Sequence, residues 1–541
     1  MDSARPAAHT ATPHSSTPHT ATPHSSAPHP TTSQATPHAT PLTIRPLPET
    51  DIDRALDLAY LVFHDTPEEE KRKHHHDLLL GCDRIGAYDG DTLVGLIAAF
   101  RFTVSVPGGE LPCPGLTFVS VAPTHRRRGV LSGMIAKLYE MCQEEGRPVA
   151  ALWASEDAIY GRFGFGPATH GNTVEINSER PLALRVTPDD GPLRLVDPAD
   201  APALLGAYYD RTRADRGGRI ARSEAWWSEE WLVTEDEEDD ELSPPRVVVL
   251  GAHPDGTQTD APQADAPQAD APQTATTPQA AADPTTPRTP ALAPTPIKGY
   301  ALYRTKSRDD ARGLVRLDEL EADTPQAAAA LWRYLADIDL TGVIRAWGRP
   351  VDDDLLLFAA DRDQVRVTGY FPALWLRLVD VRAALLTRDW AAPAALVLEV
   401  TDTQVPANDG RFRLTVSPRG TTHEGADTPH AGTGTPHAGA DTPHADTDTP
   451  HPATGTETYK ATFKTTFKTT YKATFQATYE PTTAPADLSV EVRDLGAAYL
   501  GGTRITAAVR AGLATEHTPG AAAALDAALR TDRLPHTVDE F

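Results

Sequence analysis

Three consecutive arginines, Arg126–Arg128, and the glycine that follows them lie between a predicted strand and a predicted helix. Residues 116–122 (LTFVSVA) alternate and are rich in β-formers, as in a half-buried strand. Apolar side chains then recur at helical spacing, at Val130, Leu131, Met134, Ile135, Leu138 and Met141. A strand that turns into a helix presents free N–H groups at the positive end of the helix dipole, and Gly129 lets an anion approach them. The pattern favours a pyrophosphate site over the solvent-exposed surface that is usual for an arginine run.

A second candidate group follows the next predicted strand, residues 149–154 (VAALWA). Tyr160 stands just before three glycines that alternate with aromatic residues, Gly161, Gly164 and Gly166. Such glycines predict a tight, bulged turn. A tyrosine hydroxyl can donate a proton, so this turn could hold a general acid.

The segments VAPTHRRRGVL and PVAALWASEDAIYGRFGFGPAT resemble the Eis (enhanced intracellular survival) family of GNAT N-acetyltransferases. Arg126 and Gly129 match the first and fourth places of the coenzyme A motif Q/R-x-x-G-x-G/A, and Leu131 stands in the sixth place, as it does in that family. The resemblance implies that a pantetheine arm fills a gap between two splayed strands. It implies acetyl-CoA contacts from Val119, Ser120, Val121, Arg127, Arg128, Gly129, Val130, Leu131, Ser132, Ser155 and Glu156.

The same resemblance implies catalytic roles for Tyr160 as general acid and for the α-carboxylate of Phe541 as general base. The sequence ends in Glu540-Phe541, as family members do. An ammonium acceptor must lose a proton before it attacks a thioester, and burial would raise the pKa of an α-carboxylate from about 3.5 toward a useful value. The alternative is a frayed terminus.

Direct attack in a ternary complex is expected, with the oxyanion held by backbone amides near residues 119–121. An acyl-enzyme on Cys113 or Cys142 is disfavoured, because neither has a histidine arranged beside it. The acceptor site is expected to include Asp65, Phe118 and Glu540, with an exposed surface carboxylate as an equal alternative for Asp65.

Composition limits the partners. A formal net charge of −25 disfavours nucleic acid and is compatible with a cationic amine such as an aminoglycoside, a polyamine or a lysine side chain. Three cysteines, no apolar run of about 18 residues and no hydrophobic leader predict a cytoplasmic protein without a membrane segment. No metal is expected. The family resemblance implies a homo-oligomer, a hexamer.

Three low-complexity tracts are predicted to be disordered, because 49 prolines cluster there with Thr, Ala, Asp and His. The first, residues 1–40, has spaced histidines (His9, His14, His19, His24, His29) that could bind a metal weakly, although a repeat without function is favoured. The second, 256–296, separates two strands of a predicted hairpin, 246–250 and 299–304. The third, 420–485, has an aromatic residue every fourth position. We interpret it as a strand extension rather than an anion-binding stripe.

The remaining sequence predicts an α/β (mixed α+β) protein with tandem GNAT-like domains and a sterol-carrier-protein-2-like (SCP2-like) domain. The expected boundaries are 41–180 for the catalytic domain, 181–368 for a degenerate GNAT-like domain and 369–541 for the SCP2-like domain. Helices are expected at 52–63 and 325–336, and a strand at 355–358. The second domain has no Arg-x-x-Gly loop between a strand and a helix and should not bind coenzyme A. Two rival functions are lipid transport by the last domain and a coenzyme A sensor without turnover.

Overall fold

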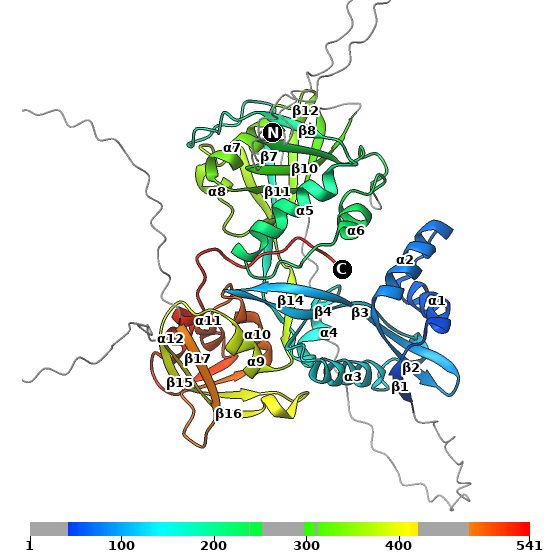
Figure 1. Ribbon diagram of the computed structural model, residues 1–541, viewed down its shortest axis with the longest axis vertical. Helices are drawn as coiled ribbons and strands as arrows, with labels where there is room; N and C mark the ends of the chain where they lie inside the picture. The colour runs from blue at the N-terminus through cyan, green and yellow to red at the C-terminus, as the bar shows by residue number, and fades with distance from the viewer. Residues whose placement is uncertain (1–41, 237–238, 252–296, 309–311, 420–474) are drawn as a thin grey trace, which may run out of the picture. The chain divides into compact units, whose positions relative to one another are not determined.

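The computed structural model describes residues 42–236, 239–251, 297–308, 312–419 and 475–541 (Figure 1). The histidines of the first tract, the whole of the second tract and most of the third lie outside these ranges, so the expectations about them stay predictions. The described chain contains one mixed sheet for each of the three expected units.

The first sheet holds the predicted strand, arginine loop and helix. Its strand order is β1 (Thr43–Pro46), β2 (Asp83–Asp89), β3 (Thr92–Val106), β4 (Gly109–Val121), β5 (Val149–Trp153), β14 (Leu374–Leu378) and β6 (Gly166–Pro167). Its helices are α1 (Ile52–Phe63), α2 (Glu69–Gly81), α3 (Val130–Glu144) and α4 (Asp157–Tyr160). The predicted strands at 116–122 and 149–154 and the helix at 52–63 are confirmed. Apolar side chains of α3, including Met134 and Leu138, are fully buried against this sheet.

The second sheet is built around a parallel strand pair covered by a helix. Its order is β13 (Val365–Pro372), β7 (His170–Asn177), β12 (Thr341–Pro350), β11 (Gly313–Ala322), β10 (Gly299–Lys306), β9 (Arg246–Leu250) and β8 (Leu193–Val196). Its helices are α5 (Ala201–Thr212), α6 (Glu224–Trp226) with a π-helical turn at Trp227–Trp231, α7 (Pro325–Ala336) and α8 (Leu355–Phe358). The predicted hairpin is confirmed, because β9 and β10 pair antiparallel from Arg246–Tyr303 to Leu250–Gly299.

The predicted strand at 355–358 is wrong, because these residues form the short helix α8. The Asp353 carboxylate accepts a hydrogen bond from Leu355 N at 2.9 Å, and the Asp354 carbonyl accepts from Phe358 N at 3.0 Å. Leu355 and Phe358, three residues apart, are buried, whereas Leu357 is 70% exposed. The short apolar run therefore follows helical rather than strand periodicity, a choice that so short a run leaves open in sequence.

The third sheet has the order β17 (Phe475–Pro481), β16 (Gly410–Pro418), β15 (Ala394–Thr401), β18 (Leu488–Glu491) and β19 (Ala514–Glu516). Its helices are α9 (Val381–Thr387), α10 (Val492–Tyr499), α11 (Ile505–Arg510) and α12 (Ala521–Leu529). Strand β17 extends this sheet beside β16, and Tyr479 on β17 is buried and stacks on Phe412 at 4.7 Å. The described end of the third tract thus forms a strand, as interpreted.

The first two sheets each contain a strand from another expected unit. β14, which falls within the expected third unit (369–541), lies between β5 and β6 of the first sheet. β7 follows the glycine-rich turn of the first unit but pairs with β12 and β13 of the second sheet. Each sheet therefore depends on a strand from beyond its own continuous sequence. No helix in the described part of the chain is long and apolar enough to cross a membrane.

Deleting residues 257–295 should leave the fold and activity intact. Strands β9 and β10 already pair up to Leu250–Gly299, and the residues left behind, 251–256 and 296–298, form a loop long enough to connect them. Loop-closure entropy depends only weakly on loop length, so we expect a melting temperature within about 2 °C of the full-length value by calorimetry. Aggregation of the deletion variant would show that the tract has a structural role.

Candidate active site

Strands β4 and β5 separate at the point where the sequence predicts chemistry. Their parallel pairing covers only Gly115–Ala151 and Leu116–Leu152. Just beyond it, the β3–β4 register shifts and Phe118 takes a left-handed conformation with φ of 50°. Such a bulge turns the end of β4 away from β5. Within the described part of the chain, residues 117–121 therefore have no partner strand on the β5 side, and a ligand with amide groups could pair with them.

The arginine loop is shaped to bind an anion. Arg127 and Gly129 both have positive φ, 62° and 81°, and Gly129 is the N-cap of α3. No side chain caps this helix within the described chain, so its first N–H groups remain available to a ligand. All three arginines are exposed, and Arg128 lies 3.5 Å from Asp89. The loop thus offers positive charge and backbone donors at one place.

The predicted contact residues surround this opening in different ways. Ser120 is buried and its hydroxyl donates to the Phe118 carbonyl at 2.8 Å, so it stabilises the bulge from within. Ser132 on α3 and both Ser155 and Glu156 after β5 are exposed. Val119, Val121 and Leu131 are partly buried against the core beneath α3, and Val130 is buried in it.

Tyr160 lies at the end of α4, with its side chain 6% exposed and its ring 6.3 Å from that of Phe165. Burial raises the pKa of Tyr160, and the neighbouring Glu156 carboxylate raises it further. The hydroxyl therefore keeps its proton at neutral pH. Gly164 has φ of 85° and closes the turn after Tyr160. A side chain at Gly164 would collide with the guanidinium of Arg377, 2.3 Å from its Cβ position.

Phe541 lies on the sheet where β4 and β5 begin to separate. A Cβ atom on Gly115 would come within 2.7 Å of the Phe541 ring. That ring packs edge-on against Phe102 at 4.9 Å and Phe100 at 6.3 Å, and Trp226 packs edge-on against the same two rings. Figure 1 accordingly shows the chain end between α6 and the long strand β3. Among the described residues no hydrogen bond or ring contact joins Tyr160 to Phe541.

The other predicted acceptor residues, Asp65, Phe118 and Glu540, differ in their surroundings. Asp65 follows α1, is 41% exposed at its side chain and lies 3.8 Å from the Lys71 ammonium. Phe118 packs edge-on against His75 at 5.2 Å, and His75 in turn hydrogen-bonds the Tyr60 hydroxyl at 2.9 Å. Glu540 is exposed. Sequence reasoning missed the α1–α2 histidine and tyrosine, which carry no recognisable spacing signal.

The sequence also gave no signal for Asp539, which is buried although it stands beside exposed Glu540. Its carboxylate accepts hydrogen bonds from Arg222 at 2.7 Å and from the indoles of Trp226 and Trp231 at 3.3 and 3.2 Å. Its carbonyl accepts from the Trp153 indole at the end of β5. The tail is therefore fixed at this residue, two positions before Phe541.

Comparisons with known proteins agree with this geometry. A model described as an acetyltransferase (GNAT) domain matches residues 43–168, another of the same description matches 279–378, and a sterol carrier protein domain matches 381–442 and 457–538. The chain is 34% identical over 487 residues to an uncharacterized N-acetyltransferase of Streptomyces avermitilis, covering 88% of this chain and 94% of that protein. It is 34% identical over 343 residues to N-acetyltransferase Eis of Mycobacterium tuberculosis, covering 61% of this chain and 73% of Eis.

The chain belongs to the Eis family of GNAT N-acetyltransferases. The crystal structure of Eis1 from Mycobacterium abscessus superimposes with a TM-score of 0.65 at 27% identity, covering 92% of this chain and all of that one. A probable N-acyltransferase of Enterococcus faecalis has the same fold, with a TM-score of 0.64 at 14% identity. This Eis-family member is thus an acyltransferase with two GNAT domains and a sterol carrier protein domain, as the sequence predicted.

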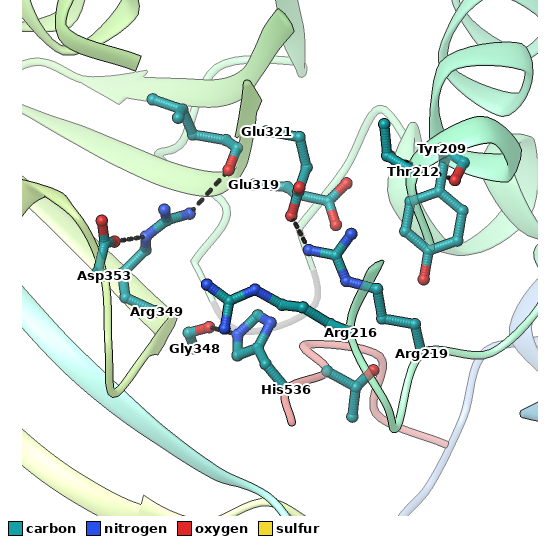
Figure 2. A network of polar contacts seen from close by, with 12 residues as sticks. Tyr209, Thr212, Arg216, Arg219, Glu319, Glu321, Gly348, Arg349, Asp353 and His536 are labelled. Carbon is teal, nitrogen blue, oxygen red and sulfur yellow. Dashed lines mark hydrogen bonds and ion pairs between the residues drawn. The ribbon is translucent and has the colours of Figure 1, made fainter. Parts of the chain in front are cut away.

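Stability of the tail in this Eis-family protein should depend on pH through His536. Burial and the nearby guanidinium groups of Arg219, Arg216 and Arg349 lower the pKa of His536 well below 6.5 (Figure 2). The hydrogen bond to the Gly348 carbonyl raises this pKa, but by less than the other effects lower it. The unfolded chain, with a histidine pKa near 6.5, therefore binds the proton more readily. The free energy of unfolding should fall as pH drops below about 6.5, by up to about 1.4 kcal/mol per pH unit.

Chemical denaturation between pH 5 and 8 measures this slope. The variant His536→Gln should lose this contribution, so its stability should fall less steeply than the parent's below pH 6.5 and run parallel to it above pH 7. Equal slopes in both proteins at acid pH would exclude His536 as the source.

Proposed function

We propose that this protein transfers an acetyl group from acetyl-CoA to a primary amine of a cationic substrate, an aminoglycoside, a polyamine or a lysine side chain. One observation carries the proposal: an uncapped, arginine-lined helix N-terminus and the ring of Phe541 both lie at the β4–β5 separation. The N-terminus of α3 suits the pyrophosphate of acetyl-CoA. The Phe541 ring lies beside the place where the acetyl thioester would be bound. Both are located on the GNAT domain that the family model matches over residues 43–168.

The residues present suit acetyl-CoA. The N–H groups of Val130, Leu131 and Ser132 at the start of α3, with the side chains of Arg127 and Arg128, would hold the pyrophosphate. Free backbone groups of residues 119–121 would pair with the pantetheine amides and stabilise the oxyanion. Ser155 and Glu156, exposed after β5, would line the other side.

The Tyr160 side chain and the α-carboxylate of Phe541 would transfer protons. We assign the thiolate proton to Tyr160, whose raised pKa keeps the hydroxyl protonated at neutral pH. We assign removal of the ammonium proton to the carboxylate of Phe541, the last residue of the sequence. Its ring packs against Phe100 and Phe102, which lie beside Trp226, so its carboxylate is held at the aromatic edge of the catalytic sheet.

The acceptor side suits a cation. The half-buried aromatic faces of Phe100, Phe102 and Trp226 can contact an ammonium group by cation–π interaction. Asp539 and Glu319 share the single cation of Arg222, so this buried cluster carries a formal charge of −1 next to the Trp226 indole. Phe118 and Glu540 complete the proposed acceptor side, and Asp65 lies farther out on the α1–α2 connection. We also propose a cytoplasmic location, from the cysteine content and the lack of a long apolar run in the sequence, and a homohexamer, on family grounds.

Replacing Tyr160 with phenylalanine should slow turnover without weakening acetyl-CoA binding. Loss of a general acid typically costs about 10²-fold or more in rate, while the ring and its packing on Phe165 are kept. Thiol release measures turnover and isothermal titration measures cofactor affinity. A variant with full turnover would remove Tyr160 from the mechanism.

Extending the chain beyond Phe541 should abolish turnover, because a peptide bond would replace the proposed base. One added glycine is the smallest such change, and the same residue added before Met1 is the matched control. We expect acetyl-CoA binding to survive in both. Undiminished activity of the C-terminally extended protein would exclude the carboxylate as the base.

Two other functions have less support. A lipid carrier needs an apolar tunnel, but the core of the third unit is filled by buried side chains of α10, α12 and the sheet. One cavity in its described part, about 510 Å³, is lined partly by the polar side chains of Arg504, Asp526 and Arg530. A coenzyme A sensor would not need a buried tyrosine and a fixed tail. Lipid extraction from the purified full-length protein and thiol release with an amine panel would separate these functions.

A further inference from the structure

The second GNAT domain contains a strand separation like the one proposed to hold acetyl-CoA. Strands β11 and β12 pair in parallel from Gly313–Thr341 to Leu317–Ala346 and then stop. Residues 318–322 of β11 lie beyond the paired part, as residues 117–121 of β4 do in the catalytic domain. The helix that follows β11 is α7, in the place that α3 takes after β4.

This second separation is closed to a cofactor. The Thr324 hydroxyl caps α7 by accepting from Ala327 N at 3.1 Å, and Pro325 occupies the first turn. The Arg349 guanidinium donates to the Leu320 carbonyl at 3.1 Å, so a side chain of β12 takes a free backbone group of β11. Figure 2 shows this bond, with the second Arg349 bond to Asp353.

Two carboxylates on the same face of β11 point to arginines instead. Glu321 pairs with Arg219, as Figure 2 also shows, and Glu319 makes two hydrogen bonds of 2.8 Å to Arg222. Tyr300 donates to Glu319 at 2.6 Å. Glu319, Tyr300 and the two arginines are almost fully buried, and the Glu321 side chain is 14% exposed, so the geometry is held by packing as well as by charge.

Both arginines belong to a segment that runs along the C-terminal tail. Arg222 donates to the Asp539 carboxylate at 2.7 Å, and the Asp539 side chain is completely buried. Earlier in the tail, His536 N donates to the Gly217 carbonyl at 2.9 Å and Arg216 donates to the Leu534 carbonyl at 2.7 Å. The tail therefore runs beside residues 216–222 of the second domain and hydrogen-bonds to them at Leu534, His536 and Asp539.

We propose that the vestigial cofactor cleft of the second GNAT domain is the cradle of the catalytic tail, and that Asp539 is its positioning residue. Glu319 orients Arg222, and Arg222 holds Asp539. The consequence for turnover rests on the function proposed above for Phe541.

Chain geometry makes Asp539 an effective tether. Two residues span at most about 7 Å when extended, so fixing Asp539 confines the Phe541 carboxylate to a small volume. The Trp153 indole, at the end of β5, also donates to the Asp539 carbonyl. This hydrogen bond fixes Asp539 relative to the catalytic sheet. A misplacement of about 1 Å at a reacting group can cost about 10²-fold in rate.

The test compares Asp539→Asn with Asp532→Asn in the full-length protein. Asp539→Asn keeps the side-chain shape and leaves one arginine paired with one glutamate, so the fold should survive. Asp532→Asn makes the same chemical change at an exposed position of the same tail. Hydrogen–deuterium exchange of peptides covering 532–541 measures how well the tail is held in place. Steady-state kinetics gives kcat, and titration with acetyl-CoA gives the cofactor Kd.

We expect Asp539→Asn to speed amide exchange in the tail at least 10-fold and to lower kcat at least 10-fold, with the acetyl-CoA Kd and exchange in α3 unchanged. Asp532→Asn should match the parent. Glu319→Gln, which leaves the tail sequence intact, should shift tail exchange and kcat in the same direction.

The possible outcomes distinguish the positioning role of Asp539 from the proposed role of Phe541 as the base. Parent-like tail exchange in Asp539→Asn would overturn the positioning role. Parent-like exchange in Glu319→Gln would overturn the role of the second cleft. Faster tail exchange with undiminished kcat would support the tether and reject Phe541 as the base.

Discussion

The pairing of β14 with β5 is the constraint on which the arrangement of the three units depends. A strand from residues 374–378 completes the catalytic sheet, and its Arg377 is wholly buried in an ion pair with Asp402 of the third unit. Removing one partner of such a pair typically costs about 3–5 kcal/mol, because the other charge stays buried and unpaired. The Arg377 guanidinium also lies under Gly164 and 5.0 Å from the centre of the Tyr139 ring. The turn that follows Tyr160 is thus supported by the sterol carrier protein domain.

The two GNAT domains differ in few residues at the end of their parallel strand pairs, where we propose a cofactor site in one and a structural cleft in the other. Both have a parallel strand pair that stops early and a helix at its end. In one, Gly129 leads into a helix with free N–H groups, and in the other the Thr324 hydroxyl accepts the hydrogen bond that an anion would take. The same fold therefore carries a reaction in one copy and, we infer, a tether in the other.

The charge near the arginine loop matters more for the proposed binding of a pyrophosphate than the net charge of the chain. The chain as a whole has a formal charge of −25, which would repel a coenzyme with several phosphates. Salt screens exposed charges beyond about 8 Å under physiological conditions. Arg126–Arg128 and the dipole of α3 therefore dominate the field that a pyrophosphate would meet at the loop.

The sequence by itself determined the local features: the strand, arginine loop and helix around Gly129, the glycine-rich turn after Tyr160, the β9–β10 hairpin and the three-unit order. These follow from periodicity, backbone conformation and family motifs, which act within a few residues. Only the tertiary structure decided that β7 and β14 change sheets, that residues 355–358 are helical, and that Asp539 rather than Glu540 is buried. Strand partners and buried ion pairs depend on residues hundreds of positions apart, such as Arg222 and Asp539, whose proximity no local pattern encodes.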